Sequence, residues 1–404
     1  MINMKDNIII KFKGGFMNEI EIFENKVNIK EFRKKELLRR AEHLKNAQRQ
    51  ILNFNDSINK TTLHITYVMT WTGICGGSKI ILQHANRLIE KGHQITIISH
   101  YPYPNWFNLN RKVSFIQVPL EQILCESIPN TSDLIVTTYW REIYEAIEQN
   151  IAPVIYFEQG DFHLFDSENV DKELFDYIYK QINLAPFIFT VSSYAQKKLK
   201  EVYNVDSTII PNAVNEDVFF PSENKHNKKI EITMIGSPNT EFKRITDIIS
   251  ALNTLKTKKQ NINVNLITPD TPNKKFSCID NLIINPKQII IGNTLRKTDI
   301  YICASMYESF CLPVLEALTS GCAVITTDNG GINDFCKNNY NCLIVEKQNI
   351  EDIIEKLNTL IYNSDLRKQL SKNAIESSRK FSWESIISNL DKYYKELVKY
   401  QISI

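Results

Sequence analysis

The stretch Glu308-Ser-Phe-Cys-Leu-Pro-Val-Leu-Glu316-Ala-Leu-Thr-Ser-Gly321 predicts a short helix with an anion-binding N-terminus. Pro313 suits the first turn, because its missing N–H would have no partner there, and Gly321 suits the helix end. Unpaired N–H groups and the helix dipole favour phosphate at such an N-terminus. The backbone amides expected there are those of Phe310, Cys311 and Leu312.

Two carboxylates flank this N-terminus. Glu308 lies in the loop before the helix and Glu316 in its first turns. Carboxylates accept hydrogen bonds from hydroxyls, so the pair beside a phosphate site suits a sugar and a ribose. Two glutamates eight residues apart also occur on ordinary solvated surfaces, and the assignment to a nucleotide-sugar site depends on the surrounding sequence.

Strands and helices alternate on both sides of this stretch. Residues 63–69 predict a strand, residues 71–77 a glycine-containing loop, residues 80–92 a helix and residues 94–99 a second strand. Such a βαβ unit implies a parallel sheet. Further strands are expected at 134–137, 154–157, 188–191, 208–210, 230–235, 263–267, 300–303, 323–327 and 342–345, with helices between them. The fold class is therefore α/β, with two doubly wound domains in tandem.

The 404 residues divide into four parts. We expect an N-terminal extension at 1–60, with a hairpin around Gly14 and Gly15 and a basic helix over 29–52. It is followed by a first domain at 61–210 and a second at 211–385. A C-terminal helix at 386–404 then returns to the first domain.

Composition excludes several classes of protein. Lys and Arg total 48 and Asp and Glu 46, which leaves a net charge of +2 and no general field for nucleic acid. Gly 12 and Pro 13 are too few for a linker-rich chain. The first residues are interspersed with charge and no 18-residue apolar run occurs, so a cytoplasmic protein is expected.

The basic helix expected over 29–52 has three explanations. Residues 1–60 contain 13 Lys and Arg against 8 Asp and Glu, or +5. A basic amphipathic helix can lie on an anionic membrane surface, here the inner one. A surface helix packed on its own protein is the more economical explanation. A contact in a homodimer is the third.

Six segments carry a family resemblance. In chain order they are Gly76-Gly77 with the helix ending Gly92-His93-Gln94, Val191-Ser192, Ile210-Pro-Asn212-Ala-Val-Asn215, Glu308 to Glu316, Asp328-Asn-Gly330-Gly331 and Phe381-Ser-Trp383-Glu384. Residues 63–395 thereby resemble the retaining glycosyltransferases of family 4, which have the GT-B fold of two facing Rossmann-like domains and a Glu-x7-Glu motif. Residues 1–60 lie outside the resemblance.

The resemblance implies roles for residues of the donor site. Glu308 would hold hydroxyls of the donor sugar, Glu316 would bind the ribose, and the amides of residues 310–312 would face sugar and phosphate. Gly76 and Gly77 would approach the diphosphate. Lys243 matches the family lysine, whereas Ser237 stands where an arginine is usual and Cys311 where a glycine is usual. We hypothesise that Arg244 supplies the second positive charge.

The chemistry implied is stabilisation of a departing nucleotide diphosphate by Lys243, Arg244 and the helix N-terminus. No Asp-x-Asp occurs in the chain, so we expect neither a metal nor another cofactor. The sugar would be transferred with retention of configuration and without a protein nucleophile.

Candidate contacts in the first domain follow its strands. His163 is a candidate catalytic or ligand contact, with Asp161 close by, although an ordinary loop histidine explains it equally well. Aromatic faces stack on sugar rings, and loops at the carboxyl ends of parallel strands are the usual ligand side. The tentative acceptor residues are Trp71, Tyr139, Trp140 and Asp161, and packing of the loops is the alternative.

The function expected is a retaining glycosyltransferase of polysaccharide biosynthesis. It would move a hexose from a nucleotide diphosphate sugar, with a UDP-sugar favoured, to a saccharide, lipid-linked or protein acceptor. Two alternatives share the fold. A nucleotide-sugar epimerase would act on the donor alone, and a non-catalytic partner subunit would bind the acceptor for an active enzyme.

Overall fold

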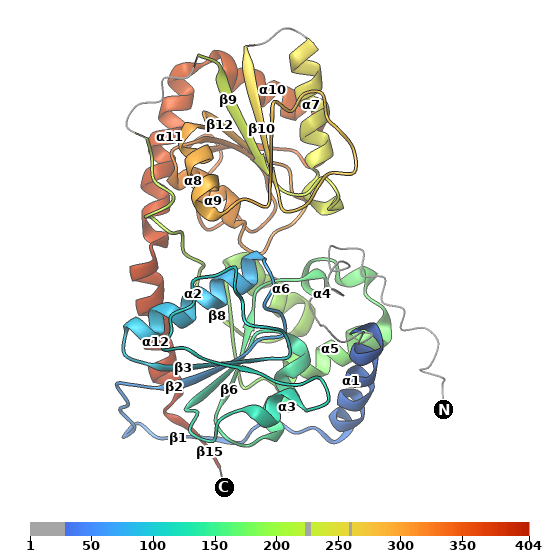
Figure 1. The fold of residues 1–404 in the computed structure, drawn as a ribbon, viewed down its shortest axis with the longest axis vertical. Helices are drawn as coiled ribbons and strands as arrows, with labels where there is room; N and C mark the ends of the chain where they lie inside the picture. The colour runs from blue at the N-terminus through green and yellow to red at the C-terminus, as the bar shows by residue number, and fades with distance from the viewer. Residues whose placement is uncertain (1–28, 223–227, 258–260, 404) are drawn as a thin grey trace.

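The computed structural model describes residues 29–222, 228–257 and 261–403. They form two α/β domains, one above the other in Figure 1, with a column of C-terminal helices along one side of both. The hairpin predicted around Gly14 and Gly15 lies outside the described residues.

The first domain is built on a seven-stranded parallel sheet in the order β4-β3-β2-β5-β6-β7-β8. Its strands are β2 (His64–Val68), β3 (Gln94–Ser99), β4 (Ser114–Gln117), β5 (Leu134–Thr137), β6 (Val154–Glu158), β7 (Phe187–Thr190) and β8 (Thr208–Ile209). The helices are α2 (Gly76–Glu90), α3 (Ile143–Glu148), α4 (Phe162–Phe165), α5 (Lys172–Leu184) and α6 (Ser193–Tyr203). Every residue of β2, β5 and β6 is buried, as expected where helices cover both faces of a sheet.

The second domain has a six-stranded parallel sheet in the order β11-β10-β9-β12-β13-β14. The strands are β9 (Ile230–Ile235), β10 (Ile262–Thr268), β11 (Asn281–Ile284), β12 (Ile300–Cys303), β13 (Ala323–Thr327) and β14 (Cys342–Val345). Its helices are α7 (Ile245–Thr257), α8 (Gln288–Lys297), α9 (Leu312–Thr319), α10 (Ile350–Tyr362) and α11 (Ser364–Ser378). The α/β class and the two Rossmann-like domains expected from the sequence are confirmed.

The chain returns to the first domain through α12 (Trp383–Leu397). The hydroxyls of Tyr394 on α12 and Tyr67 on β2 are 3.1 Å apart, and Asp391 lies 2.9 Å from His93. Beyond α12, β15 (Tyr400–Ile402) pairs antiparallel with β1 (Leu52–Phe54). The C-terminal helix therefore belongs to the core of the first domain.

The sequence missed β4 and β11, which are the outermost strands of their sheets. Both are largely exposed or half-buried, because an edge strand has a neighbour on one side only. Their patterns consequently lack the continuous apolar run of the central strands.

The helix predicted over 29–52 is shorter than expected. Helix α1 (Ile29–His43) and a 3-10 turn end at Asn46, and Ala47 is already extended. The side-chain amide of Gln50 then bonds to Val154 N and Ala152 O, at 3.0 and 3.1 Å. These bonds hold the segment extended beside the first domain, where it leads into β1.

The basic face expected on α1 is partly turned inward. Arg40 is 3% exposed and pairs with Glu36 and with Glu145 of α3, each at 2.9 Å. Arg39 also bonds to Glu145. The helix is packed on its own first domain (Figure 1), so much of the charge counted for a membrane surface serves intramolecular pairs.

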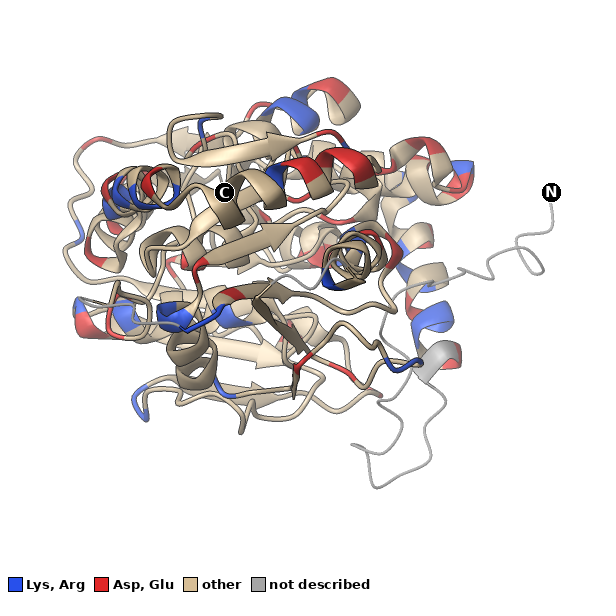
Figure 2. Ribbon diagram, turned by 90° about the horizontal axis from the view of Figure 1, so that it is seen from above, with Lys and Arg blue, Asp and Glu red and all other residues tan. Residues whose placement is uncertain are grey.

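Charge on the rest of the molecule is mixed. Figure 2 shows basic and acidic segments interspersed on the helices that surround the sheets. Among the described residues, no helix combines the length and apolar character needed to cross a bilayer.

Candidate donor-sugar site

The two domains meet at a tight contact between Gly160 and Ser309. Gly160 follows β6 with φ of 86°, and a Cβ on it would lie 2.4 Å from the Ser309 Cβ. Nearby, Ser192 Oγ donates to Ser309 O at 2.5 Å, and Ser193 N donates to Asp334 at 2.9 Å. These contacts place the loop before α9 against the carboxyl edge of the first-domain sheet.

Glu308 is held in that loop by backbone and side chain. Its amide donates to Asn329 O at 3.0 Å, and a Cβ on Gly331 would lie 2.8 Å from Glu308 O. Lys243, which ends a 3-10 turn after β9, places Nζ 2.5 Å from Glu308 Oε1. Burial lowers the pKa of Lys243, but the carboxylate of Glu308 outweighs it and the net shift is upward. Lys243 therefore stays charged at neutral pH.

Helix α9 begins where the proline and glycine positions predict. Pro313 lies in the first turn, and Cys311 is the N-cap with φ of 58°, a left-handed conformation that favours glycine. Its side chain makes no cap bond, so no capping side chain covers the adjoining amides of the predicted phosphate-binding segment. The buried thiol instead lies 3.9 Å from the sulfur of Cys303.

The N-terminus of α2 approaches the N-terminus of α9. Cys75 caps α2 by accepting from Ser78 N at 3.3 Å. A Cβ on Gly76 would lie 3.9 Å from Leu312 Cδ1, and one on Gly77 would lie 3.3 Å from Gln159 Nε2. Two helix N-termini, one from each domain, thus converge beside the Glu308 loop. Converging dipoles of this polarity favour an anion between them.

Lys79 lies at the candidate site and was not predicted from the sequence. It lies on the first turn of α2, and its Nζ is 3.2 Å from Oε1 of Glu316 on α9. Its position two residues beyond the Gly76-Gly77 pair could have identified it from the sequence.

Arg244 and Ser237 both bond to carboxylates of the second domain. Arg244 donates from Nε and a terminal nitrogen to both oxygens of Asp247, at 2.9 and 3.0 Å. Its charge is thus paired at the start of α7, and its assignment to the diphosphate stays a prediction. Ser237 donates to Asp270 at 2.8 Å.

His163 and Trp140 lie in the core of the first domain, which corrects their assignment as ligand contacts. His163 is fully buried, with Nδ1 2.9 Å from the Tyr203 hydroxyl and Nε2 3.4 Å from Glu158. Trp140 is 4% exposed. The short helix α4 turns His163 inward, because Asp161 caps that helix at Phe162 N.

The other first-domain candidates share the carboxyl edge of the sheet. Tyr139 donates its hydroxyl to Asp161 at 2.7 Å, and Trp71 packs edge-to-face on Tyr101. Trp71, Tyr139 and Asp161 are all half-buried.

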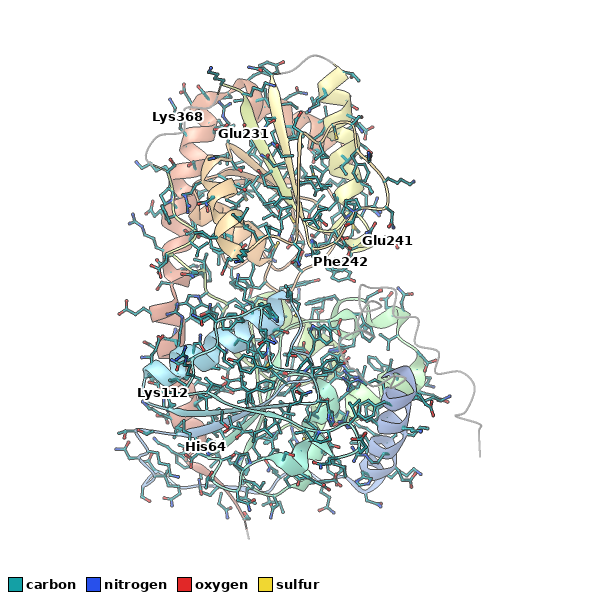
Figure 3. All side chains as sticks on the ribbon, in the orientation of Figure 1. His64, Lys112, Glu231, Glu241, Phe242 and Lys368 are labelled. Carbon is teal, nitrogen blue, oxygen red and sulfur yellow. The ribbon has the colours of Figure 1, made fainter. Side chains whose placement is uncertain are left out.

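An aromatic stack links the domains and was not predicted. Phe242 stacks on Tyr307, Tyr307 on Phe165 and Phe165 on Tyr194, with centroid separations of 4.9, 5.7 and 5.4 Å. Phe242 lies on the edge of the second domain that faces the first (Figure 3).

Among the described residues, Cys303, Glu308 and Cys311 form a group whose ligand atoms could hold a metal ion. The hydrogen bond from Cys311 lowers the pKa of Cys303 to about 7, whereas burial raises the pKa of Cys311. Glu308 already pairs with Lys243, so a cation there would compete with the lysine.

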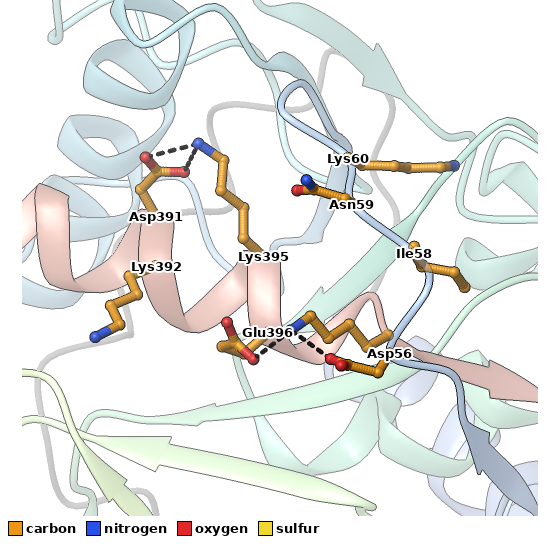
Figure 4. Close-up of a pocket in the computed structure, with 9 residues that line it drawn as sticks. Asp56, Ile58, Asn59, Lys60, Asp391, Lys392, Lys395 and Glu396 are labelled. Carbon is orange, nitrogen blue, oxygen red and sulfur yellow. Dashed lines mark hydrogen bonds and ion pairs between the residues drawn. The ribbon is translucent and has the colours of Figure 1, made fainter.

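A separate hollow lies far from this site, between residues 56–60 and α12 (Figure 4). Lys395 pairs with Asp391, and Lys399 pairs with Asp56 and Glu396. Because these charges largely neutralise one another, the hollow is not a candidate site.

Two facing Rossmann-like domains that meet at helix N-termini define the GT-B fold. A sucrose-phosphate synthase of Thermosynechococcus elongatus has this architecture with a TM-score of 0.71 at 15% identity, covering 83% of this chain and 99% of that one. HepE of Anabaena, solved in complex with UDP-glucose, gives 0.69 at 13% identity over 83% of this chain and all of that one.

Sequence comparison points to the same class. Residues 215–377 match the family described as "Glycosyl transferases group 1". An uncharacterized glycosyltransferase of Methanocaldococcus jannaschii is 28% identical over 52% of this chain and 59% of its own length. The D-inositol 3-phosphate glycosyltransferase of Corynebacterium jeikeium is 32% identical over 30% of this chain and 28% of its own. The chain therefore spans less than two thirds of these relatives.

Proposed function

We propose that the protein is a retaining glycosyltransferase that needs no metal. It moves a hexose from a nucleotide diphosphate sugar, with a UDP-sugar favoured, to a saccharide, lipid-linked or protein acceptor. The observation that carries this proposal is the convergence of the α2 and α9 N-termini beside Glu308 and Glu316.

Each group has a defined task in the proposed reaction. The diphosphate lies between the two helix N-termini, where unpaired amides and dipoles stabilise its charge. Glu316 accepts from the ribose hydroxyls, and Lys79 stays within reach of the phosphates. Glu308 accepts from the sugar hydroxyls while Lys243 balances its charge.

When the bond between the anomeric carbon and the phosphate oxygen breaks, negative charge develops on the leaving diphosphate. Stabilising that charge is the main catalytic requirement. Lys243, Lys79 and the helix amides supply positive potential there, once Lys79 has rearranged from its pair with Glu316. The acceptor hydroxyl attacks the anomeric carbon on the face from which the diphosphate departs and passes its proton to the leaving phosphate oxygen. The configuration is thereby retained and no protein nucleophile is needed.

Relatives support a hexose donor. One carries the name MMP alpha-(1->4)-mannosyltransferase, from Mycolicibacterium hassiacum, and is 20% identical over 80% of this chain and 95% of its own length. The HepE complex supports a UDP-sugar as the donor to test first.

The test is incubation of the purified full chain with UDP-, GDP- and dTDP-sugars, with and without saccharide acceptors. We expect slow nucleotide release with one donor and faster release when an acceptor is added. The product should have the same anomeric configuration as the donor sugar. Inversion at C2 of the donor sugar without nucleotide release would favour the epimerase. The absence of any reaction with every donor would favour the non-catalytic partner subunit. Glu308→Gln serves as the inactive control.

A further inference from the structure

Arg141 lies at the carboxyl edge of the first-domain sheet without a carboxylate partner. It follows β5 in the 3-10 turn Trp140–Glu142. Its Nε is buried without a hydrogen-bond partner, and no carboxylate of the described residues pairs with it. The guanidinium instead lies 4.8 Å from the Tyr139 ring centroid and 5.8 Å from that of Trp140. Burial and the nearby Arg33 both lower the pKa of Arg141.

Arg33 brings a second guanidinium to the same sheet edge. It extends from α1 and donates to the Tyr101 hydroxyl at 3.1 Å and to Thr70 O at 3.5 Å. Tyr101 follows β3, and Thr70 follows β2. The N-terminal helix, which lies outside the family resemblance, thus contributes positive charge to the ligand side of the sheet.

The carboxylates around these two residues already have other partners. Four arginines, Arg33, Arg39, Arg40 and Arg141, share this region with three glutamates, Glu36, Glu142 and Glu145. Each glutamate is already engaged by Arg33, Arg39 or Arg40. Asp161 accepts from Tyr139 and from Phe162 N. Arg141 is half-buried and pairs with none of these carboxylates, and its buried Nε lacks a hydrogen-bond partner that an anion could supply.

Contacts connect Arg141 to the donor site. Ser309 touches Gly160, the next residue Asp161 accepts from Tyr139, and Tyr139 stacks against Arg141. An acceptor held at Arg141 would therefore lie on the first-domain side of the Glu308 loop. Half-buried Trp71 and Tyr139 provide aromatic faces for its sugar ring.

We propose that Arg141, assisted by Arg33, binds an anionic group of the acceptor, a phosphate or a carboxylate on a saccharide. This inference rests on the proposed function, because it places the anion on the acceptor rather than on the donor. The guanidinium fork matches either group with two parallel hydrogen bonds.

The experiment compares glucose 6-phosphate, glucuronate and glucose as probes with the wild-type chain, Arg141→Gln, Arg141→Lys and Arg111→Gln. Arg111 is an exposed arginine in the loop after β3 and is the matched control. Calorimetry measures binding of each probe, and kcat/KM is measured for each as acceptor. We expect the wild type to prefer an anionic probe over glucose. The ratio of anionic-probe binding to glucose binding should fall by about tenfold or more in Arg141→Gln and by less in Arg141→Lys. In Arg111→Gln this ratio should stay constant.

The outcomes separate the two proposals. Equal binding of glucose and both anions to the wild type, or an equal loss for all three probes in Arg141→Gln, overturns the acceptor assignment. Preference for phosphate over carboxylate, or the reverse, identifies the anion. If no donor is turned over, the proposed function fails, yet the calorimetric preference and its loss in Arg141→Gln still decide whether this is an anion site. Should Arg141→Gln not fold, Arg141→Lys and Arg33→Gln replace it.

Discussion

Lys79 of the first domain and Glu316 of the second form an ion pair, with 3.2 Å between Nζ and Oε1. The pair connects the first turn of α2 to the first turns of α9, and the Lys79 ammonium also lies 5.9 Å from the Phe219 ring centroid. A donor that binds Glu316 must therefore rearrange an interdomain contact.

Replacing Lys79 by methionine should weaken the binding of UDP by about fivefold to tenfold while affecting uridine little. The reason is that an ammonium beside the phosphates contributes about 1 to 1.5 kcal/mol at a partly exposed site. Titration calorimetry with UDP and uridine measures both. Lys91→Met, at the exposed end of the same helix, is the control, and equal losses for UDP and uridine would contradict this role.

Lys243 and Glu308 should behave as one unit in catalysis. Because Nζ and Oε1 are 2.5 Å apart, removing either partner leaves a half-buried charge without its counter-ion. We expect Lys243→Met and Glu308→Gln each to lower kcat by about a hundredfold or more. The double variant should lose much less than the product of the single effects, since the second substitution removes the orphaned charge. Strictly multiplicative losses in steady-state rates would show that the two act independently.

Gly160→Ala should disrupt the contact between the domains in addition to straining the backbone. Gly160 and Gly92 have φ of 86° and 92°, so both substitutions incur about 1 to 2 kcal/mol of strain. A Cβ on Gly160 would also meet Ser309 and Phe165 within 2.6 Å, whereas one on Gly92 meets nothing within 4 Å. Thermal unfolding and donor binding of the two variants are compared. Only Gly160→Ala should lose donor affinity, and matching behaviour would exclude the steric explanation.

His84 should make the fold sensitive to acid. Burial lowers the pKa of His84 to about 3, and the ring packs on Phe157 and Trp383. Between pH 6.5 and 3 the unfolded chain binds a proton that the native chain rejects, so unfolding free energy falls as pH falls, by about 1.4 kcal/mol per unit in that window.

The variant His84→Phe should flatten this part of the pH profile in urea unfolding, since it keeps the ring and removes the titrating group. His43→Phe, at an exposed position of α1, is the control. Unfolding curves whose pH slopes are the same in His84→Phe and the wild type would rule out His84 as the source.

Local sequence signals were sufficient for the donor side of the site. Pro313 and Gly321 bound α9 as expected, and Glu308 and Glu316 lie beside its N-terminus because the strand, loop and helix that carry them are contiguous. Lys243 reaches Glu308 from the 3-10 turn that follows β9, the strand that neighbours β12 in the sheet. The central strands of both domains were found for a similar reason, since a buried parallel strand is a continuous apolar run.

Long-range packing decided the rest. His163 has suitable chemistry at a suitable place in the chain, but its side chain is buried against the Tyr203 hydroxyl. Arg244 bonds to the neighbouring Asp247, a contact that the sequence did not predict. The arginines of α1 form an amphipathic pattern that suits a membrane, yet three glutamates from α1 and residues 142–145 take up most of their charge.

The α/β class, the two-domain organisation and the helix N-terminus that marks the donor site follow from the sequence, because apolar periodicity and capping residues act over a few neighbouring positions. The partner of Lys79, the burial of His163 and the unpartnered Nε of Arg141 were decided by the tertiary structure alone. Each depends on side chains from distant elements meeting in space, and the free energy of an ion pair or a buried polar group is determined by those neighbours and by the exclusion of water.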